Sequence, residues 1–132
     1  MGEGEQGRST AFISYARSDA TVAAAIARSL EQHGVSAFLD SSLGVGESWA
    51  EVLAKAVRDA DVVVVLLSPD YFSSRWSQSE LSYAFEMKKL IVPVVVRDCE
   101  VTGPLTYLNR FDLTRDDPRD IHRLTELIED MA

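Results

Sequence analysis

The six residues Val62–Leu67 (VVVVLL) form an unbroken apolar run that begins with four valines. Such a continuous β-branched run is typical of a strand covered on both faces, as in a parallel sheet. Leu90–Val96 is a second run of this kind. It contains Pro93, which cannot donate a hydrogen bond to a neighbouring strand, so we expect a bulge or a strand edge there. The chain therefore has to place a layer of structure on each face of a sheet.

Shorter strand-like and helix-like segments alternate around these two runs. Apolar residues spaced three and four apart indicate helices, and short runs rich in β-branched or aromatic residues indicate strands. The expected strands are Thr10–Tyr15, Val35–Leu39, Val62–Leu67, Leu90–Val96 and Arg110–Leu113, and the expected helices are Thr21–His33, Trp49–Arg58, Trp76–Lys88 and Pro118–Met131. This order predicts an α/β, flavodoxin-like three-layer sandwich. Its five-stranded parallel sheet should have strand order 2-1-3-4-5, with helices on both faces.

Local signals mark the ends and the inner faces of the helices. Ser18 or Asp19 can cap the first long helix, and Gly34 is expected to end it. The apolar residues of the last helix that should face the core are Ile121, Leu124, Leu127 and Ile128.

The chain of 132 residues has the length of one domain. Residues 1–8 are polar and rich in glycine, so we expect a flexible leader followed by a single domain over residues 9–132. The N-terminus lacks the apolar segment of a signal peptide, and the apolar runs are too short to span a bilayer. A single cysteine, Cys99, cannot form an internal disulfide. These features predict a cytoplasmic protein with no membrane partner.

Charge and motif spacing exclude several classes of function. The formal net charge of −8 argues against binding nucleic acid, whose phosphates require lysine and arginine. The sequence has no metal-ligand spacing, so we expect no metal site and no cofactor. Gly44-Val45-Gly46 lacks the third glycine of a dinucleotide fingerprint. Neither Ser14 nor Ser68 has a histidine nearby that would suggest a catalytic triad.

In an open parallel sheet, ligands bind beyond the carboxyl ends of the strands, near the point where the strand order reverses. Three charged residues fall there in the expected fold. Arg17 follows the first strand, Asp40 ends the second, and Glu80 lies in the first turn of the helix after the third. The sequence therefore predicts a polar site at this edge of the sheet.

Several segments together resemble TIR domains, and the resemblance covers residues 10–132. The segments that carry it are FISYARSD at 12–19, DSSLGVGESW at 40–49, VVVVLLSPDYFSSRW at 62–76 and WSQSE at 76–80. WSQSE resembles the W-C-x-x-E pattern of NAD-cleaving TIR domains, with Ser77 in place of the usual cysteine. The loop around Gly44–Gly46 lacks the proline that many relatives carry.

The resemblance implies cleavage of the nicotinamide–ribose bond of NAD⁺, with Glu80 as the catalytic residue. Bacterial and plant TIR domains of this kind release nicotinamide with ADP-ribose or a cyclic isomer. Local sequence also allows a purely structural interpretation of Glu80. Ser77 and Glu80 have the S-x-x-E spacing of a capping box, in which the glutamate reaches back to a backbone N–H. The two roles are compatible.

The resemblance and the strand-end rule together suggest further residues that bind NAD⁺. They are Phe12, Ser14, Arg17, Asp40, Ser48, Trp49 and Trp76. Arg17 can bind a pyrophosphate or ribose in a bidentate manner, and Trp49 can stack on a ring of the nucleotide. Each also has a structural alternative, because Trp49, Trp76 and Phe12 can pack in the core. Arg17 can pair with an aspartate, and Asp40 can order the loop that follows it.

The resemblance also implies a partner, since TIR domains associate with one another. We expect the effector module of a bacterial defence protein, activated when self-association orders the loop at residues 42–48. The alternative is a noncatalytic TIR–TIR signalling scaffold, or a virulence module that mimics one of the host. A response-regulator receiver has the same fold class. It would need a phosphoacceptor aspartate after the third strand, where Ser68 and Pro69 stand.

Overall fold

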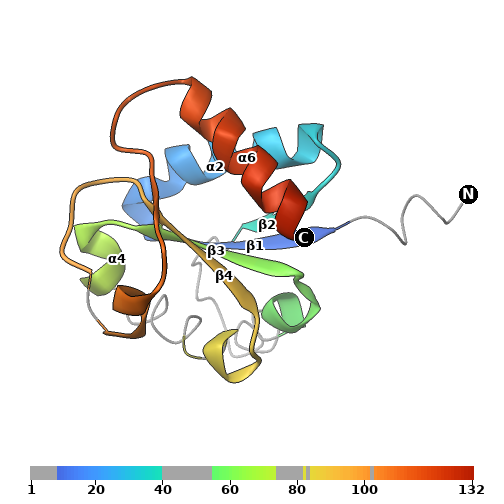
Figure 1. The fold of residues 1–132 in the computed structure, drawn as a ribbon, viewed down its shortest axis with the longest axis horizontal. Coiled ribbons are helices and arrows are strands. Elements are labelled where there is room, and N and C mark those ends of the chain that lie inside the picture. Colours follow the sequence, from blue (N-terminus) through green and yellow to red (C-terminus); the bar gives the residue numbers. More distant parts are fainter. Residues whose placement is uncertain (1–8, 40–54, 74–81, 83, 102) are drawn as a thin grey trace, which may run out of the picture.

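The computed structural model describes residues 9–39, 55–73, 82, 84–101 and 103–132. Five parallel strands form one sheet in the order β2-β1-β3-β4-β5 (Figure 1). The strands are β1 Thr10–Ser14, β2 Ser36–Leu39, β3 Val62–Leu67, β4 Leu90–Val95 and β5 Phe111–Asp112. The predicted α/β class and strand order are confirmed, and every strand end lies within one residue of its expected position.

Helices cover both faces of this sheet. The long helices α2 (Ala20–Gln32) and α6 (Arg119–Met131) lie together on one face, and the short helix α4 (Pro69–Ser73) lies on the other (Figure 1). Two 3₁₀ helices, η1 (Arg17–Asp19) and η2 (Gly103–Tyr107), follow β1 and precede β5. Of the two remaining expected helices, residues 55–59, 82 and 84–86 are helical. Met87 and Lys88, expected to end the second of them, form a turn, and the other residues of both helices lie outside the described residues.

Strand β3 is the centre of the core, and all six of its residues are buried. Val62, Val64 and Leu66 belong to the cluster under α2 and α6. Val63, Val65 and Leu67 belong to the cluster on the opposite face, which includes Tyr71 of α4. Successive side chains of β3 therefore alternate between two cores, one on each face of the sheet. This explains why the apolar run is continuous, as predicted.

Pro93 lies within β4 without a bulge. The β3–β4 register runs without interruption from Val62 opposite Leu90 to Leu67 opposite Val95. The backbone N–H of Val96 donates to Leu67. Since backbone groups of alternate residues point to the same side of a strand, the nitrogen of Pro93 points away from β3. On that side β5 pairs only with Val94 and Val95, so the expected strand edge is present and the expected bulge is not.

Helix α2 ends where the sequence indicated. Gly34 has a φ of 84°, a left-handed conformation that glycine adopts without steric cost. The N–H of Val35 donates to the carbonyl of Leu30, and that of Gly34 to the carbonyl of Glu31. These two bonds form a Schellman motif, which satisfies carbonyls at the helix end and turns the chain into β2.

Helix α6 packs on α2 through a narrower apolar face than predicted. Leu124 and Ile128 are fully buried, and the hydroxyls of Ser29 and Thr125 lie 2.6 Å apart between the helices. Leu127, also expected in the core, is 40% exposed. The reason is the shortness of β5, because Leu127 lines a pocket beside β4 that a longer edge strand would fill.

A hydrogen-bonded carboxylate, that of Asp117, lies just before helix α6, whose N-cap residue is Pro118. The carboxylate of Asp117 accepts a hydrogen bond from the backbone N–H of Arg119 at 3.0 Å and a second one from its guanidinium. Pro118 lies between Asp117 and Arg119 in sequence. As a proline it has no backbone N–H that would need a hydrogen-bond acceptor. The guanidinium, through its hydrogen bond, is the main cause of the low pKa of Asp117, about 2 against an ordinary 3.8.

In the described part of the chain, no helix combines the length and the apolar character needed to cross a bilayer.

The contrast between Leu124 and Leu127 can be tested by truncation. Leu124→Ala leaves a cavity beneath α6 and should lower the free energy of unfolding by about 2–5 kcal/mol. Leu127→Ala removes a side chain already in contact with water and should cost less than about 1 kcal/mol. Urea unfolding of both variants measures the difference. Equal losses would mean that Leu127 is part of the core.

The hydrogen-bonded carboxylate of Asp117 should make a pH-dependent contribution to stability. Because the pKa of Asp117 is lowered to about 2 on folding, the ionised carboxylate stabilises the native state fully above the unfolded value near 3.8. That contribution disappears as the pH falls from about 4 to about 2. The difference in unfolding free energy between the native protein and Asp117→Asn should therefore shrink over this interval. A difference that stays constant from pH 6 to pH 2 would contradict the assignment.

Candidate functional site

The carboxyl ends of β1, β3 and β4 meet at one edge of the sheet, next to the reversal of strand order between β1 and β3. The segments that continue from them are η1, the Ser68 turn into α4, and Arg97. Polar and charged side chains therefore gather where a ligand of an open parallel sheet is expected.

Asp19 is the buried charge of this edge. Its side chain is only 3% exposed. One carboxylate oxygen accepts a hydrogen bond from the hydroxyl of Ser68 at 2.5 Å, and the other accepts one from Nε of Arg97 at 2.9 Å. A buried carboxylate without such partners would be strongly destabilising. Asp19 stands at the N-cap position of α2, but its side chain makes no capping bond, so the expected capping role is wrong.

Arg97 extends the network to α4. Its Nη2 atom donates to the hydroxyl of Ser18 at 3.1 Å and to the carboxylate of Asp70 at 3.0 Å. Ser18 itself donates to the same oxygen of Asp70 at 2.6 Å. The Ser18 hydroxyl, followed by Arg97, lowers the pKa of Asp70. We call these five residues, Ser18, Asp19, Ser68, Asp70 and Arg97, the edge network.

Three of the predicted NAD⁺-binding residues lie on β1 and η1. Phe12 is fully buried and stacks on Phe38, with ring centroids 5.5 Å apart. Ser14 is also fully buried, and its hydroxyl lies 3.3 Å from that of Tyr71. Arg17 begins η1 and is exposed. Of these three, only Arg17 presents its side chain to solvent at the carboxyl edge.

The other predicted site residues lie outside the described residues. They are the catalytic candidate Glu80 and the binding candidates Asp40, Ser48, Trp49 and Trp76. The described helix α4 ends at Ser73, seven positions before Glu80.

Sequence reasoning missed the edge network. Arg97 follows directly after the apolar run of β4, so the strand-end rule that selected Arg17 would have selected it too. For Asp19 the sequence suggests only a cap of the following helix or a pair with Arg17. Its partner Arg97 lies 78 positions away, and no local pattern connects the two.

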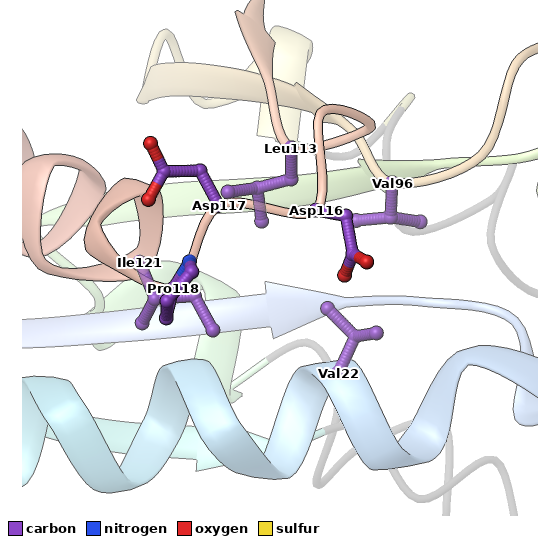
Figure 2. A pocket seen from close by; sticks show the side chains of 7 residues that line it. All are labelled: Val22, Val96, Leu113, Asp116, Asp117, Pro118 and Ile121. Carbon is purple, nitrogen blue, oxygen red and sulfur yellow. The ribbon is translucent and has the colours of Figure 1, made fainter.

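A pocket of about 240 Å³ opens between the N-terminal turns of α2 and α6 (Figure 2). Its lining is mainly hydrocarbon from Val22, Val96, Leu113, Pro118 and Ile121. The carboxylate of Asp116 lies over Val22, and that of Asp117 turns away (Figure 2). Small-molecule sites usually have about 300–1,000 Å³, and a hydrocarbon lining with acidic groups does not suit a diphosphate.

A second, more polar pocket of about 390 Å³ lies beyond the carboxyl ends of β4 and β5. It contains Cys99, whose pKa is raised, first by burial and then by the charge of Asp98. A thiol with a raised pKa is a poor nucleophile at neutral pH, so this pocket lacks an activated cysteine. Among the described residues, His, Cys, Asp and Glu form no group of three or more that could hold a metal ion.

Comparison with known proteins identifies the family. The family model described as TIR domain matches residues 11–128. The TIR domain of a Toll-related receptor from Hydra magnipapillata superposes with a TM-score of 0.76 at 25% identity, over 92% of this chain and 96% of that one. The TIR domains of the activated Roq1 resistosome superpose with a TM-score of 0.69 at 21% identity, over 92% and 98%.

A curated relative adds an activity to the comparison. A probable 2′ cyclic ADP-D-ribose synthase of Brachypodium distachyon is 33% identical over 96 residues, which are 70% of this chain and 43% of the relative. The chain thus spans less than half the length of the curated relatives it matches. The family model covers nearly the whole chain and the superposed domains share its sheet, so this chain belongs to the TIR domain family.

Proposed function

We propose that this TIR domain is an NAD⁺ nucleosidase, which releases nicotinamide together with ADP-ribose or a cyclic isomer of it. The observation that carries the proposal is the 33% identity with a probable 2′ cyclic ADP-D-ribose synthase, in a chain that has Glu80 within WSQSE. The carboxyl edge of the sheet, with Arg17 exposed on it, supplies a suitable position for such a site.

The chemistry requires one well-placed carboxylate. Cleavage expels nicotinamide as a neutral pyridine, so the leaving group needs no general acid. Positive charge develops on the ribose, as in the oxocarbenium-like transition state of glycoside hydrolysis. We assign to Glu80 the stabilisation of that charge, because a preorganised anion is most effective where charge develops.

The binding residues have separate roles in this proposal. Arg17 pairs with the diphosphate, since a guanidinium offers two parallel N–H donors to an anion. Trp49 stacks on a ring of the nucleotide, and Asp40, Ser48 and Trp76 complete the wall around it. Phe12 and Ser14, both fully buried, support the site from beneath. NAD⁺ is the substrate, and the proposed reaction needs no other cofactor.

We further propose that residues 9–132 act as the effector module of a cytoplasmic bacterial defence protein, with other TIR domains as partners and self-association as the activating step. Two TIR–TIR assemblies, the activated Roq1 resistosome and the RPS4–RRS1 heterodimer, have this fold. A noncatalytic scaffold would associate in the same way without cleaving NAD⁺. Substitution of Glu80 distinguishes the two functions, because only the enzyme needs this residue.

The first experiment follows nicotinamide release by chromatography. Glu80→Ala should reduce kcat by about a hundredfold or more, because it removes the transition-state stabiliser. Glu80→Gln should be similarly impaired, since the amide keeps the shape and lacks the charge.

Glu86→Ala is the matched control, because Glu86 is an exposed carboxylate in the helical residues 84–86 that follow Glu80 in sequence. It should leave the rate unchanged. Equal release from Glu80→Ala and the native protein would remove Glu80 from the mechanism. No release from the native protein, even when concentrated or crowded, would favour the scaffold.

Activation by self-association predicts a rate that depends on concentration. Ordering a loop costs conformational entropy, which intermolecular contacts can offset. Activity per molecule should therefore rise with protein concentration, in parallel with the assembled fraction measured by light scattering. Constant activity per molecule over a hundredfold range of concentration would contradict this mechanism.

A further inference from the structure

We infer that Arg97 is a positioning residue of the NAD⁺ site, acting through the edge network to hold η1, and with it Arg17, in place at the carboxyl edge of the sheet. This inference rests on the proposed function. The buried carboxylate of Asp19 is the centre of this network.

The burial of Asp19 makes its partners obligatory. Its side chain is 3% exposed, and Ser68 and Arg97 each bond to a different one of its oxygens. Removing a partner from a buried charge leaves that charge uncompensated, and the segment that carries it then moves towards water. The segment in question is η1, of which Asp19 is the last residue.

The guanidinium of Arg97 holds the carboxylates of Asp19 and Asp70 at the same time. Its Nε bonds to Asp19 after β1, and its Nη2 bonds to Asp70 in α4. Because the guanidinium is planar and rigid, bonds from two of its nitrogens fix both the separation and the orientation of the two carboxylates. A lysine has one point charge and cannot bond to both in the same way. The three chain segments that follow β1, β3 and β4 are thereby joined at one side chain.

Helix η1 depends on this support. It contains only three residues, and two backbone bonds hold its ends: the N–H of Asp19 donates to the carbonyl of Ala16, and the N–H of Ala20 donates to the carbonyl of Arg17. So short a 3₁₀ turn has little stability of its own. Arg17 lies two residues before Asp19, so any displacement of Asp19 moves Arg17 as well.

The charges of the network argue against a direct ligand role for Arg97. Its guanidinium already faces two carboxylates, those of Asp19 and Asp70, which leave the three groups with a net charge of −1. An anionic diphosphate would meet repulsion at these three groups, and Arg17 is not one of them. Arg97 therefore acts on the substrate through η1.

The expected kinetic signature differs from that of Glu80. A group that holds a binding residue contributes equally to the ground state and the transition state, so its loss raises KM and leaves kcat nearly unchanged. Arg97→Gln should raise KM for NAD⁺ about tenfold, because a small misplacement of a positioned group is costly. Its kcat should stay within about twofold. Arg97→Lys keeps the positive charge but loses the planar guanidinium and its two donating nitrogens. This variant should therefore give an intermediate KM.

Arg123→Gln is the matched control. Arg123 is 47% exposed, as is Arg97, and it bonds to Asp120, another buried aspartate that is 1% exposed. It contacts none of the edge network. We expect this variant to lower stability in urea without raising KM. An equal rise in KM for both variants would reduce the role of Arg97 to general stability. An unchanged KM in Arg97→Gln would overturn the inference.

Amide hydrogen exchange tests the positioning step without relying on activity. The N–H of Asp19 should exchange about tenfold faster in Arg97→Gln and at the native rate in Arg123→Gln. If Arg97→Gln does not fold, Arg97→Lys is compared with the native protein in both measurements. A native protein that releases no nicotinamide would refute the proposed function alone, and the exchange of Asp19 would then decide whether Arg97 holds η1. Unchanged exchange would refute that hold.

Discussion

Burial of β3 on both of its faces is the constraint on which the rest of this fold depends. Six consecutive apolar side chains alternate between two cores, so neither face of the sheet can be left to water. The long helices α2 and α6 cover one face, and α4 with the cluster around Tyr71 covers the other. A parallel arrangement follows, because the connections between these strands have to cross over the sheet, and it brings the carboxyl ends of β1, β3 and β4 to one edge.

At that edge, the groups that stabilise the fold also determine its geometry. The buried carboxylate of Asp19 requires donors, and it obtains them from Ser68, which follows β3, and from Arg97, which follows β4. The same bonds define where the chain goes as it leaves the sheet. A site for NAD⁺ at this edge would therefore inherit its geometry from groups that do not touch the substrate, which is common where binding residues stand on short turns.

The parts of the fold that depend on local patterns could be predicted from the sequence, whereas those that depend on distant partners could not. Continuous and periodic apolar runs predicted all five strands and their order, and Gly34 predicted the end of α2. Leu127 was misplaced because helical spacing does not show how far the neighbouring strand extends. Asp19 was misinterpreted because a capping role is local, whereas its actual partner lies at the end of β4.

The residues of the candidate site also fall into those that the sequence could indicate and those that depend on distant partners. Glu80, Trp49 and the loop at residues 42–48 were selected by resemblance to TIR domains, and they remain predictions because they lie outside the described residues. Arg17 was selected by the strand-end rule, and the structure places it, exposed, at the carboxyl edge. The bonds of Arg97 to Ser18 and Asp70 could not have been predicted from the sequence, because these partners lie 79 and 27 positions away from it.

Pro93 has a consequence for how this sheet meets other chains. Its nitrogen points to the side on which β5 pairs only with Val94 and Val95. Among the described residues, no strand pairs with the amino-terminal half of β4 on that side, and Pro93 offers no N–H there. An incoming strand needs a complete row of donors and acceptors to extend a sheet, and proline at an edge interrupts that row. The substitution of any other residue there would complete it. Pro93 thus disfavours fusion of two such sheets edge to edge along this side of β4.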